Sequence, residues 1–145
     1  MELVYFIDTG FGRYEEFYHY PVDLISNDEI YARQLCEYFI KDGMQYKLVS
    51  NEMEEGSEIL VIKKDGRAQS FLNEATYPPD QIHIEFRQYR QVGDMPLLYT
   101  LKVETHWHVI RFLLKDVVDI PDVGQKERDS AEIDEDRKVY VIYVK

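Results

Sequence analysis

The stretch KVYVIYV, residues 138–144, places six apolar or aromatic side chains in succession. Successive side chains of a β-strand point to opposite faces, so a strand of this composition is apolar on both faces. The stretch LVYFI, residues 3–7, has the same character. Both stretches therefore predict strands that the rest of the protein covers on each side.

Strand signals also dominate the chain between these two stretches. Apolar and polar residues alternate in three segments that predict strands: MQYKLV (44–49), QIHIEFRQYR (81–90) and LLYTLKVE (97–104). The segment EILVIKKDGRAQSFL, residues 58–72, contains the dipeptide Asp65-Gly66, which is a strong signal for the turn of a β-hairpin. We therefore predict two strands there, joined at Asp65-Gly66.

The clearest helix signal covers SNDEIYARQLCEYFIKDG, residues 26–43. Ser26 and Glu29 have the spacing of a capping box, in which a serine accepts a hydrogen bond from the first helical turn. Gly43 can end the helix in the left-handed conformation. Four apolar side chains recur at helical spacing and predict one apolar face: Tyr31, Leu35, Tyr38 and Phe39.

Two later segments are less regular. HWHVIRFLLKDVV, residues 106–118, fits a strand or a short helix, and its β-branched residues favour a strand. PDVGQKERDSAEIDEDR, residues 121–137, predicts an acidic solvated loop or a frayed helix turn. Together these signals predict a single α+β domain spanning residues 1–145. One amphipathic helix would pack on a largely antiparallel, curved sheet of about six to eight strands.

The charge balance limits the classes of partner. The chain of 145 residues carries 28 acidic and 17 basic side chains, which gives a formal net charge of −11. Nucleic acids and anionic membrane surfaces attract basic proteins, so we expect neither as a direct partner. An acidic surface instead favours encounter with a basic protein. Aromatic residues make up 14% of the chain, and they suit sheet surfaces and binding faces alike.

The single cysteine, Cys36, cannot form a disulfide within the chain. The first residues do not combine a basic start with an apolar stretch of signal-peptide length, and no apolar run approaches the length of a membrane span. We therefore expect a cytoplasmic protein. Because Cys36 lies beside the apolar stripe of the predicted helix, we expect an inert thiol rather than a reactive one.

The sequence Asp8-Thr9-Gly10, preceded by apolar residues, resembles the catalytic loop of aspartic proteases. That family places a small residue after the glycine, where this chain has Phe11. It also needs a later apolar-apolar-Gly segment that folds over the first loop, and none fits here. We therefore interpret Asp8 as the polar end of a strand and assign it no catalytic role.

The strongest chemical signal is THWHV, residues 105–109. On a strand, His106 and His108 would point to one face and supply half of a zinc or iron site. His83 and Glu85 would share a face of another strand and could complete it. A metal-dependent enzyme centred on His106 and His108 is therefore one functional hypothesis, although no cofactor is required by any complete motif.

Our leading hypothesis rests on acidity and aromatic content. We predict a small non-catalytic binding protein that masks or inhibits a basic protein partner, as immunity proteins, antitoxins and inhibitors of bacterial defence enzymes do. A structural or assembly subunit, which buries exposed strands in a homo-oligomer, is a further alternative. The residues predicted to contact the partner are two tyrosines and three loop acids: Tyr18, Tyr20, Glu132, Asp134 and Glu135.

Overall fold

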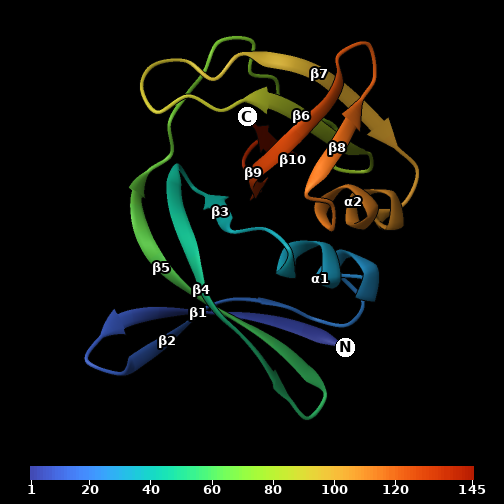
Figure 1. Cartoon of the computed structure of the whole chain (residues 1–145). Coiled ribbons are helices and arrows are strands. Elements are labelled where there is room, and N and C mark those ends of the chain that lie inside the picture. The colour runs from blue at the N-terminus through green and yellow to red at the C-terminus, as the bar shows by residue number, and fades with distance from the viewer.

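The computed structural model describes all 145 residues, and strands contain most of them (Figure 1). Ten strands form one mixed sheet, and there are two short helices. The prediction of one helix on a largely antiparallel sheet of six to eight strands is therefore wrong. The elements are β1 (Glu2–Gly10), β2 (Arg13–Tyr20), α1 (Asn27–Gln34), β3 (Tyr38–Lys41), β4 (Met44–Glu54), β5 (Ser57–Arg67), β6 (Ile82–Gln88), β7 (Leu97–Val103), α2 (His106–Leu113), β8 (Val117–Ile120), β9 (Gly124–Asp134) and β10 (Val139–Val144).

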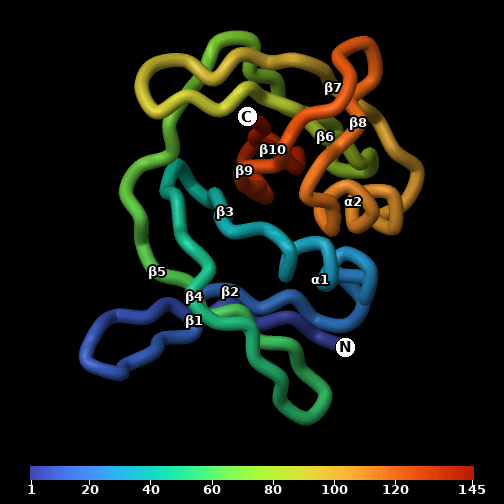
Figure 2. The backbone as a smooth tube through the Cα atoms, in the orientation of Figure 1, coloured from blue at the N-terminus to red at the C-terminus, as the bar shows by residue number.

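The strand order is β2-β1-β5-β4-β3-β9-β10-β6-β7, and β8 pairs with β9 outside this path. Three pairs are parallel, namely β1 with β5, β3 with β9, and β10 with β6. The first part of the chain forms one half of the sheet and the last part forms the other, as the colours of Figure 2 show. The short pairing of β3 with β9 joins the two halves, and we call it the seam.

The helices lie next to each other on one side of the curved sheet, between its two halves (Figure 1). They cover one face, where 23 buried residues form the main core. Ile30 of α1, Val109 of α2 and Ile142 of β10 all belong to this core and are fully buried. No helix of the structure combines the length and the apolar character that a membrane crossing needs.

The helix predicted over residues 26–43 is shorter than expected. Ser26 does cap α1, because its Oγ accepts a hydrogen bond from the Glu29 amide at 3.2 Å. The helix ends at Gln34, however, and Tyr38 and Phe39 belong to strand β3. Aromatic and β-branched residues prefer strands, and here they pair with β4 and β9 in the sheet.

Neither Asp-Gly dipeptide forms the predicted structure, which was a helix end at Gly43 and a hairpin turn at Asp65-Gly66. Asp42 and Gly43 have φ angles of 52° and 77° and form the two-residue loop of the β3–β4 hairpin. Strand β5 instead continues through Asp65 and Gly66, which together oppose the single residue Gln45 of β4. This arrangement is a β-bulge, in which one strand contains an extra residue.

Two further predictions are corrected in the last third of the chain. Residues 106–113 form helix α2 rather than a strand, and its buried side chains are Val109, Ile110 and Leu113. Residues 124–134 form strand β9 rather than a solvated loop. Ala131 and Ile133 alternate with Glu132 and Asp134, which is a strand pattern. The high density of acidic residues in this segment makes that pattern hard to recognise.

The alternation in β6, β9 and β10 gives the centre of the sheet two different faces. One face, the apolar face, contributes Ile84, Phe86, Ala131, Ile133, Tyr140, Ile142 and Val144 to the main core. The opposite face, which we call the polar face, contributes Glu85, Arg87, Glu132, Asp134 and Tyr143, and all five are buried. Val139 and Val141 of β10 also lie on this face and form a small apolar cluster with Tyr143. Burying charged side chains is costly unless they are paired. A group of them on one face therefore marks a candidate functional site.

Candidate functional site

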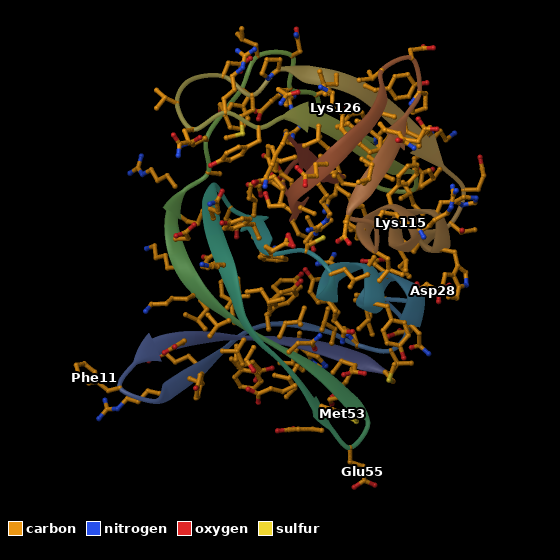
Figure 3. All side chains as sticks on the ribbon, in the orientation of Figure 1. Phe11, Asp28, Met53, Glu55, Lys115 and Lys126 are labelled. Carbon is orange, nitrogen blue, oxygen red and sulfur yellow. The ribbon has the colours of Figure 1, made fainter.

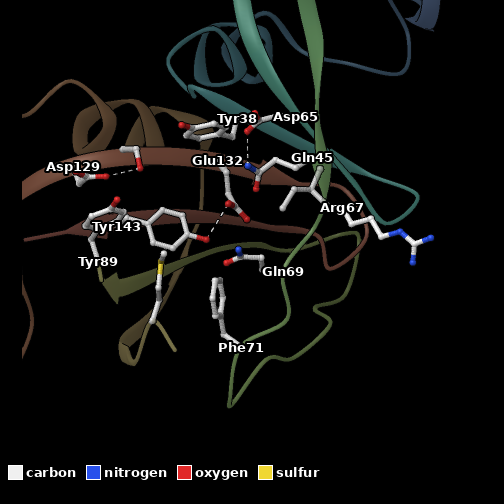
Figure 4. A pocket seen from close by; sticks show the side chains of 13 residues that line it. Tyr38, Gln45, Asp65, Arg67, Gln69, Phe71, Tyr89, Asp129, Glu132 and Tyr143 are labelled. Carbon is white, nitrogen blue, oxygen red and sulfur yellow. Dashed lines mark hydrogen bonds between the residues drawn. The ribbon is translucent and has the colours of Figure 1, made fainter. Parts of the chain in front are cut away.

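A cavity of about 270 Å³ lies on the polar face at the seam (Figure 4). Strands from both halves of the sheet contribute to it, together with the two loops that flank β6. We call this cavity the Glu132 pocket. Its lining side chains are Tyr38, Ile40, Gln45, Asp65, Arg67, Gln69, Phe71, Tyr89, Met95, Asp129, Ser130, Glu132 and Tyr143.

Glu132 is the most buried acid of the pocket, with 4% of its surface exposed. Its Oε1 accepts a hydrogen bond of 2.9 Å from the hydroxyl of Tyr143, which Figure 4 shows as a dashed line. Burial raises the pKa of Glu132 to about 8, and the nearby charge of Asp134 adds to the effect. The hydrogen bond from Tyr143 opposes this shift only in part.

Glu132 differs from the other two buried carboxylates in having no basic partner. Glu85 forms ion pairs with Arg87 at 2.9 Å and with Arg137 at 2.7 Å. Asp134 forms an ion pair with Arg137 at 3.1 Å. No ion pair of the structure includes Glu132, so its carboxyl group faces the pocket with only the Tyr143 hydroxyl as a partner.

Arg87 fixes the loops that cover the polar face. Its guanidinium donates to the carbonyl oxygens of Leu72 and Met95 at 3.1 and 2.9 Å, and to that of Asn73 at 3.3 Å. These bonds hold the segments before β6 and after it against the sheet. As a result Phe71 and Met95 lie over the pocket, opposite strands β3 to β5.

Two further carboxylates line the pocket, and each lies at a β-bulge. Asp65 belongs to the bulge of β5 and accepts a hydrogen bond of 2.9 Å from Gln45. Asp129 is the extra residue where β9 shifts register against β10, and it accepts a hydrogen bond of 3.0 Å from Ser130. Bulges redirect side chains, and here they turn two acids toward the same cavity as Glu132.

The pocket combines these acids with four aromatic rings, those of Tyr38, Phe71, Tyr89 and Tyr143. Aromatic faces attract cations, and an unpaired buried carboxylate is strongly stabilised by one. Arg67 also lines the pocket, but its guanidinium points away from Glu132 (Figure 4). The arrangement is therefore suited to a cationic group that enters from outside.

The structure separates the four residues predicted to bind metal. His106 and His108 lie two positions apart on helix α2, so their side chains do not share a face. His108 bonds with Thr105, and the Glu85 carboxylate is held by Arg87 and Arg137. His83 and His106 do line a common cavity of about 280 Å³. No three His, Cys, Asp or Glu side chains gather closely enough to hold a metal ion.

The predicted partner-binding residues lie in two regions of the fold. Tyr18 and Tyr20 belong to β2, and the three acids lie at the end of β9 or directly after it. Glu132 and Asp134 are buried strand residues rather than exposed loop acids. Tyr18 is 40% exposed on the edge strand β2. Tyr20, also on β2, donates a hydrogen bond to Glu135. Only Glu132 among the five residues lines the pocket described here.

The two other residues singled out in the sequence have structural surroundings. Asp8 lies near the end of β1, and its Oδ1 accepts a hydrogen bond of 2.8 Å from the amide of Gly10, the last residue of that strand. Cys36 is buried, and burial raises the pKa of its thiol. The thiol contacts the carbonyl oxygen of Ala32.

Most pocket residues come from segments whose sequence indicates no binding or catalytic site. Tyr38 lies on the seam, where it pairs with Glu132, although its spacing in the sequence predicts a helical residue. Period-two alternation in residues 131–134 was the one available signal for Glu132, and the high density of acids around it obscured that signal. Comparisons with family models, with curated proteins and with solved structures found no match to this chain.

Proposed function

We propose that this protein binds and masks a basic protein partner, and that the Glu132 pocket receives a positively charged side chain of that partner. The proposal rests mainly on the burial and the surroundings of Glu132. It is a buried carboxylate without a basic partner, and it faces a cavity lined by aromatic rings. A cation in that cavity would favour the ionised form of Glu132, as Arg87 and Arg137 do for Glu85.

The charge of the whole molecule supports the same function. A net charge of −11 attracts a basic partner over long distances and raises the rate of encounter. The acids that line the pocket beside Glu132, Asp65 and Asp129, would orient the incoming group before it is desolvated. Aromatic residues commonly dominate the energetics of protein interfaces, and four of them line this pocket.

The proposal is tested with a peptide rich in arginine and lysine and a matched peptide in which glutamine replaces every basic residue. Surface plasmon resonance on the immobilised full chain measures association and dissociation rates at two salt concentrations. We expect only the basic peptide to bind. Its association should slow as salt rises, because salt screens charges beyond about 8 Å at physiological ionic strength. Its dissociation should change less.

Two matched variants locate the binding. Glu132→Gln removes one acid in the pocket, and Glu55→Gln removes one acid at the exposed tip of the β4–β5 hairpin, which Figure 3 labels. We expect Glu132→Gln to weaken binding about tenfold or more, since truncating a desolvated ion pair is costly. Glu55→Gln should change it less than about twofold. Equal losses in both variants, or no binding of the basic peptide, would contradict the proposal.

A further inference from the structure

We infer that the Glu132 pocket selects a guanidinium group, so that the partner side chain is an arginine rather than a lysine, and that its entry releases a proton from Glu132. This inference rests on the proposed function, which it deepens by naming the side chain and the accompanying proton.

The cluster around Arg33 shows how this fold accommodates a buried guanidinium. Arg33 of α1 forms ion pairs with Glu135 at 2.5 Å and with Glu29 at 3.0 Å. Its guanidinium lies 4.6 Å from the ring centroid of Tyr20 and 6.0 Å from that of Phe39. The hydroxyl of Tyr20 also donates to Glu135. A carboxylate, a tyrosine hydroxyl that donates to it, and aromatic rings thus surround one arginine.

The Glu132 pocket contains the same kinds of group. Tyr143 donates to Glu132 as Tyr20 donates to Glu135, and further aromatic rings face the cavity. The difference is that no basic side chain of this chain pairs with Glu132. In addition, the three ion pairs that Glu85 and Asp134 make are all with arginine, and none is with lysine. The pocket therefore matches the surroundings that this fold uses for a guanidinium.

The acceptors in the pocket also fit a guanidinium better than an ammonium. A guanidinium carries five N–H donors in one plane and stacks on aromatic rings, whereas an ammonium carries three donors around one point. Besides Glu132, the cavity offers carboxylates from Asp65 and Asp129 and side-chain amides from Gln45 and Gln69. Its volume of about 270 Å³ is just below the roughly 300–1,000 Å³ of pockets for small organic ligands, which suits one long side chain.

Proton release follows from the partners of Glu132. With its pKa raised to about 8 by burial, Glu132 is mostly protonated at neutral pH. A guanidinium favours the carboxylate form, and the pKa of Glu135 beside Arg33 is about 2, although burial alone would raise it. Charged or titratable groups near Glu132 come from several elements: Asp134 and Asp129 of β9, Tyr143 of β10, Tyr38 of β3, Asp65 and Arg67 of β5, Arg137 of the β9–β10 turn and Glu74 of the loop before β6.

The test uses three capped glycine peptides that differ only in a central arginine, citrulline or lysine. Citrulline has the shape of arginine without its charge. Binding to the full chain is measured by NMR titration at several pH values. We expect arginine to bind about tenfold tighter than lysine and citrulline not to bind. The affinity for arginine should rise close to tenfold per pH unit below about pH 8 and level off above it, because one proton leaves on binding.

Variants separate this inference from the proposed function. Glu132→Gln should abolish both the preference for arginine and its pH dependence, and Glu55→Gln should preserve both. Arg67→Gln removes a competing positive charge at the pocket and should tighten arginine binding. If lysine and arginine peptides bind equally, or if affinity does not change with pH, the inference fails and the proposed function stands. If no basic peptide binds at all, both fail.

Discussion

Glu132 and Glu135 lie three residues apart, yet their carboxyl groups behave in opposite ways. Burial raises the pKa of Glu132 to about 8 in the pocket on the polar face. Burial acts on Glu135 as well, but the charge of Arg33 and the hydrogen bonds from Tyr20 and Arg33 bring its pKa to about 2. Each carboxylate accepts a hydrogen bond from a tyrosine. Between these two acids, the guanidinium of Arg33 therefore makes the difference, since burial raises the pKa of both.

The two carboxyl groups also differ in whether this chain supplies their basic partner. The Arg33 cluster is complete within the chain, and it ties α1 to the end of β9 and to β2. The Glu132 pocket lacks the matching base and has a cavity instead. A buried carboxyl group beside a guanidinium stays ionised, whereas one without a basic partner holds its proton more tightly.

The largest effect is expected when the complete cluster is broken. Arg33→Met leaves Glu135 mostly buried without its main partner, and removing one member of a buried ion pair costs about 3–5 kcal/mol. We expect a loss of that size in the free energy of unfolding, measured by urea denaturation at neutral pH. The same substitution at the exposed Arg111 of α2 should change stability by less than about 0.5 kcal/mol. A small loss for Arg33→Met would mean that the cluster does not stabilise the fold.

The second prediction concerns how stability depends on pH. Glu132 binds its proton more tightly in the folded protein, so its contribution is fully present below about pH 4.5 and is lost as pH rises through about 8. The loss should be on the order of a few kcal/mol. Glu135 has the opposite sign, since its contribution is present above about pH 4.5 and is lost as pH falls through about 2.

Urea denaturation across this pH range tests both signs. Glu132→Gln should reduce the decline between about pH 4.5 and 8, where the raised pKa of Asp134 also contributes, and above pH 8 the variant should be more stable than the unmodified protein. A decline that persists unchanged in Glu132→Gln would show that another group causes it. Arg33→Met should weaken the loss at low pH, because Glu135 no longer gains from ionisation.

The smallest effect is expected at Tyr143. Tyr143→Phe removes the one hydrogen bond that Glu132 accepts, which costs about 1 kcal/mol in the free energy of unfolding. Because that bond lowers the pKa of Glu132, its removal should raise this pKa further, as measured by NMR titration of the side-chain carboxyl carbon. Tyr14→Phe, at an exposed tyrosine of β2, should leave both quantities unchanged. An unaltered pKa in Tyr143→Phe would contradict the described contact.

Local sequence signals were reliable where a side-chain pattern had only one interpretation. The strands at residues 3–7 and 138–144 are present in β1 and β10. Ser26 caps a helix as its spacing indicated. The two Asp-Gly dipeptides show the limit of such signals, because the same pair forms a hairpin loop at Asp42-Gly43 and a bulge at Asp65-Gly66. The pairing partner, rather than the dipeptide, selects between these conformations.

The amino-acid sequence already shows that the chain is rich in strands and strongly acidic, because alternation, β-branched residues and charge are local properties. The pairing of β3 with β9 follows from tertiary contacts, and it brings Tyr38 to Glu132, which is far away along the chain. It also decided that Glu85 and Asp134 find arginines while Glu132 does not. Burial and ion pairing depend on contacts between distant segments, and those contacts set both the pKa of Glu132 and the chemistry of its pocket.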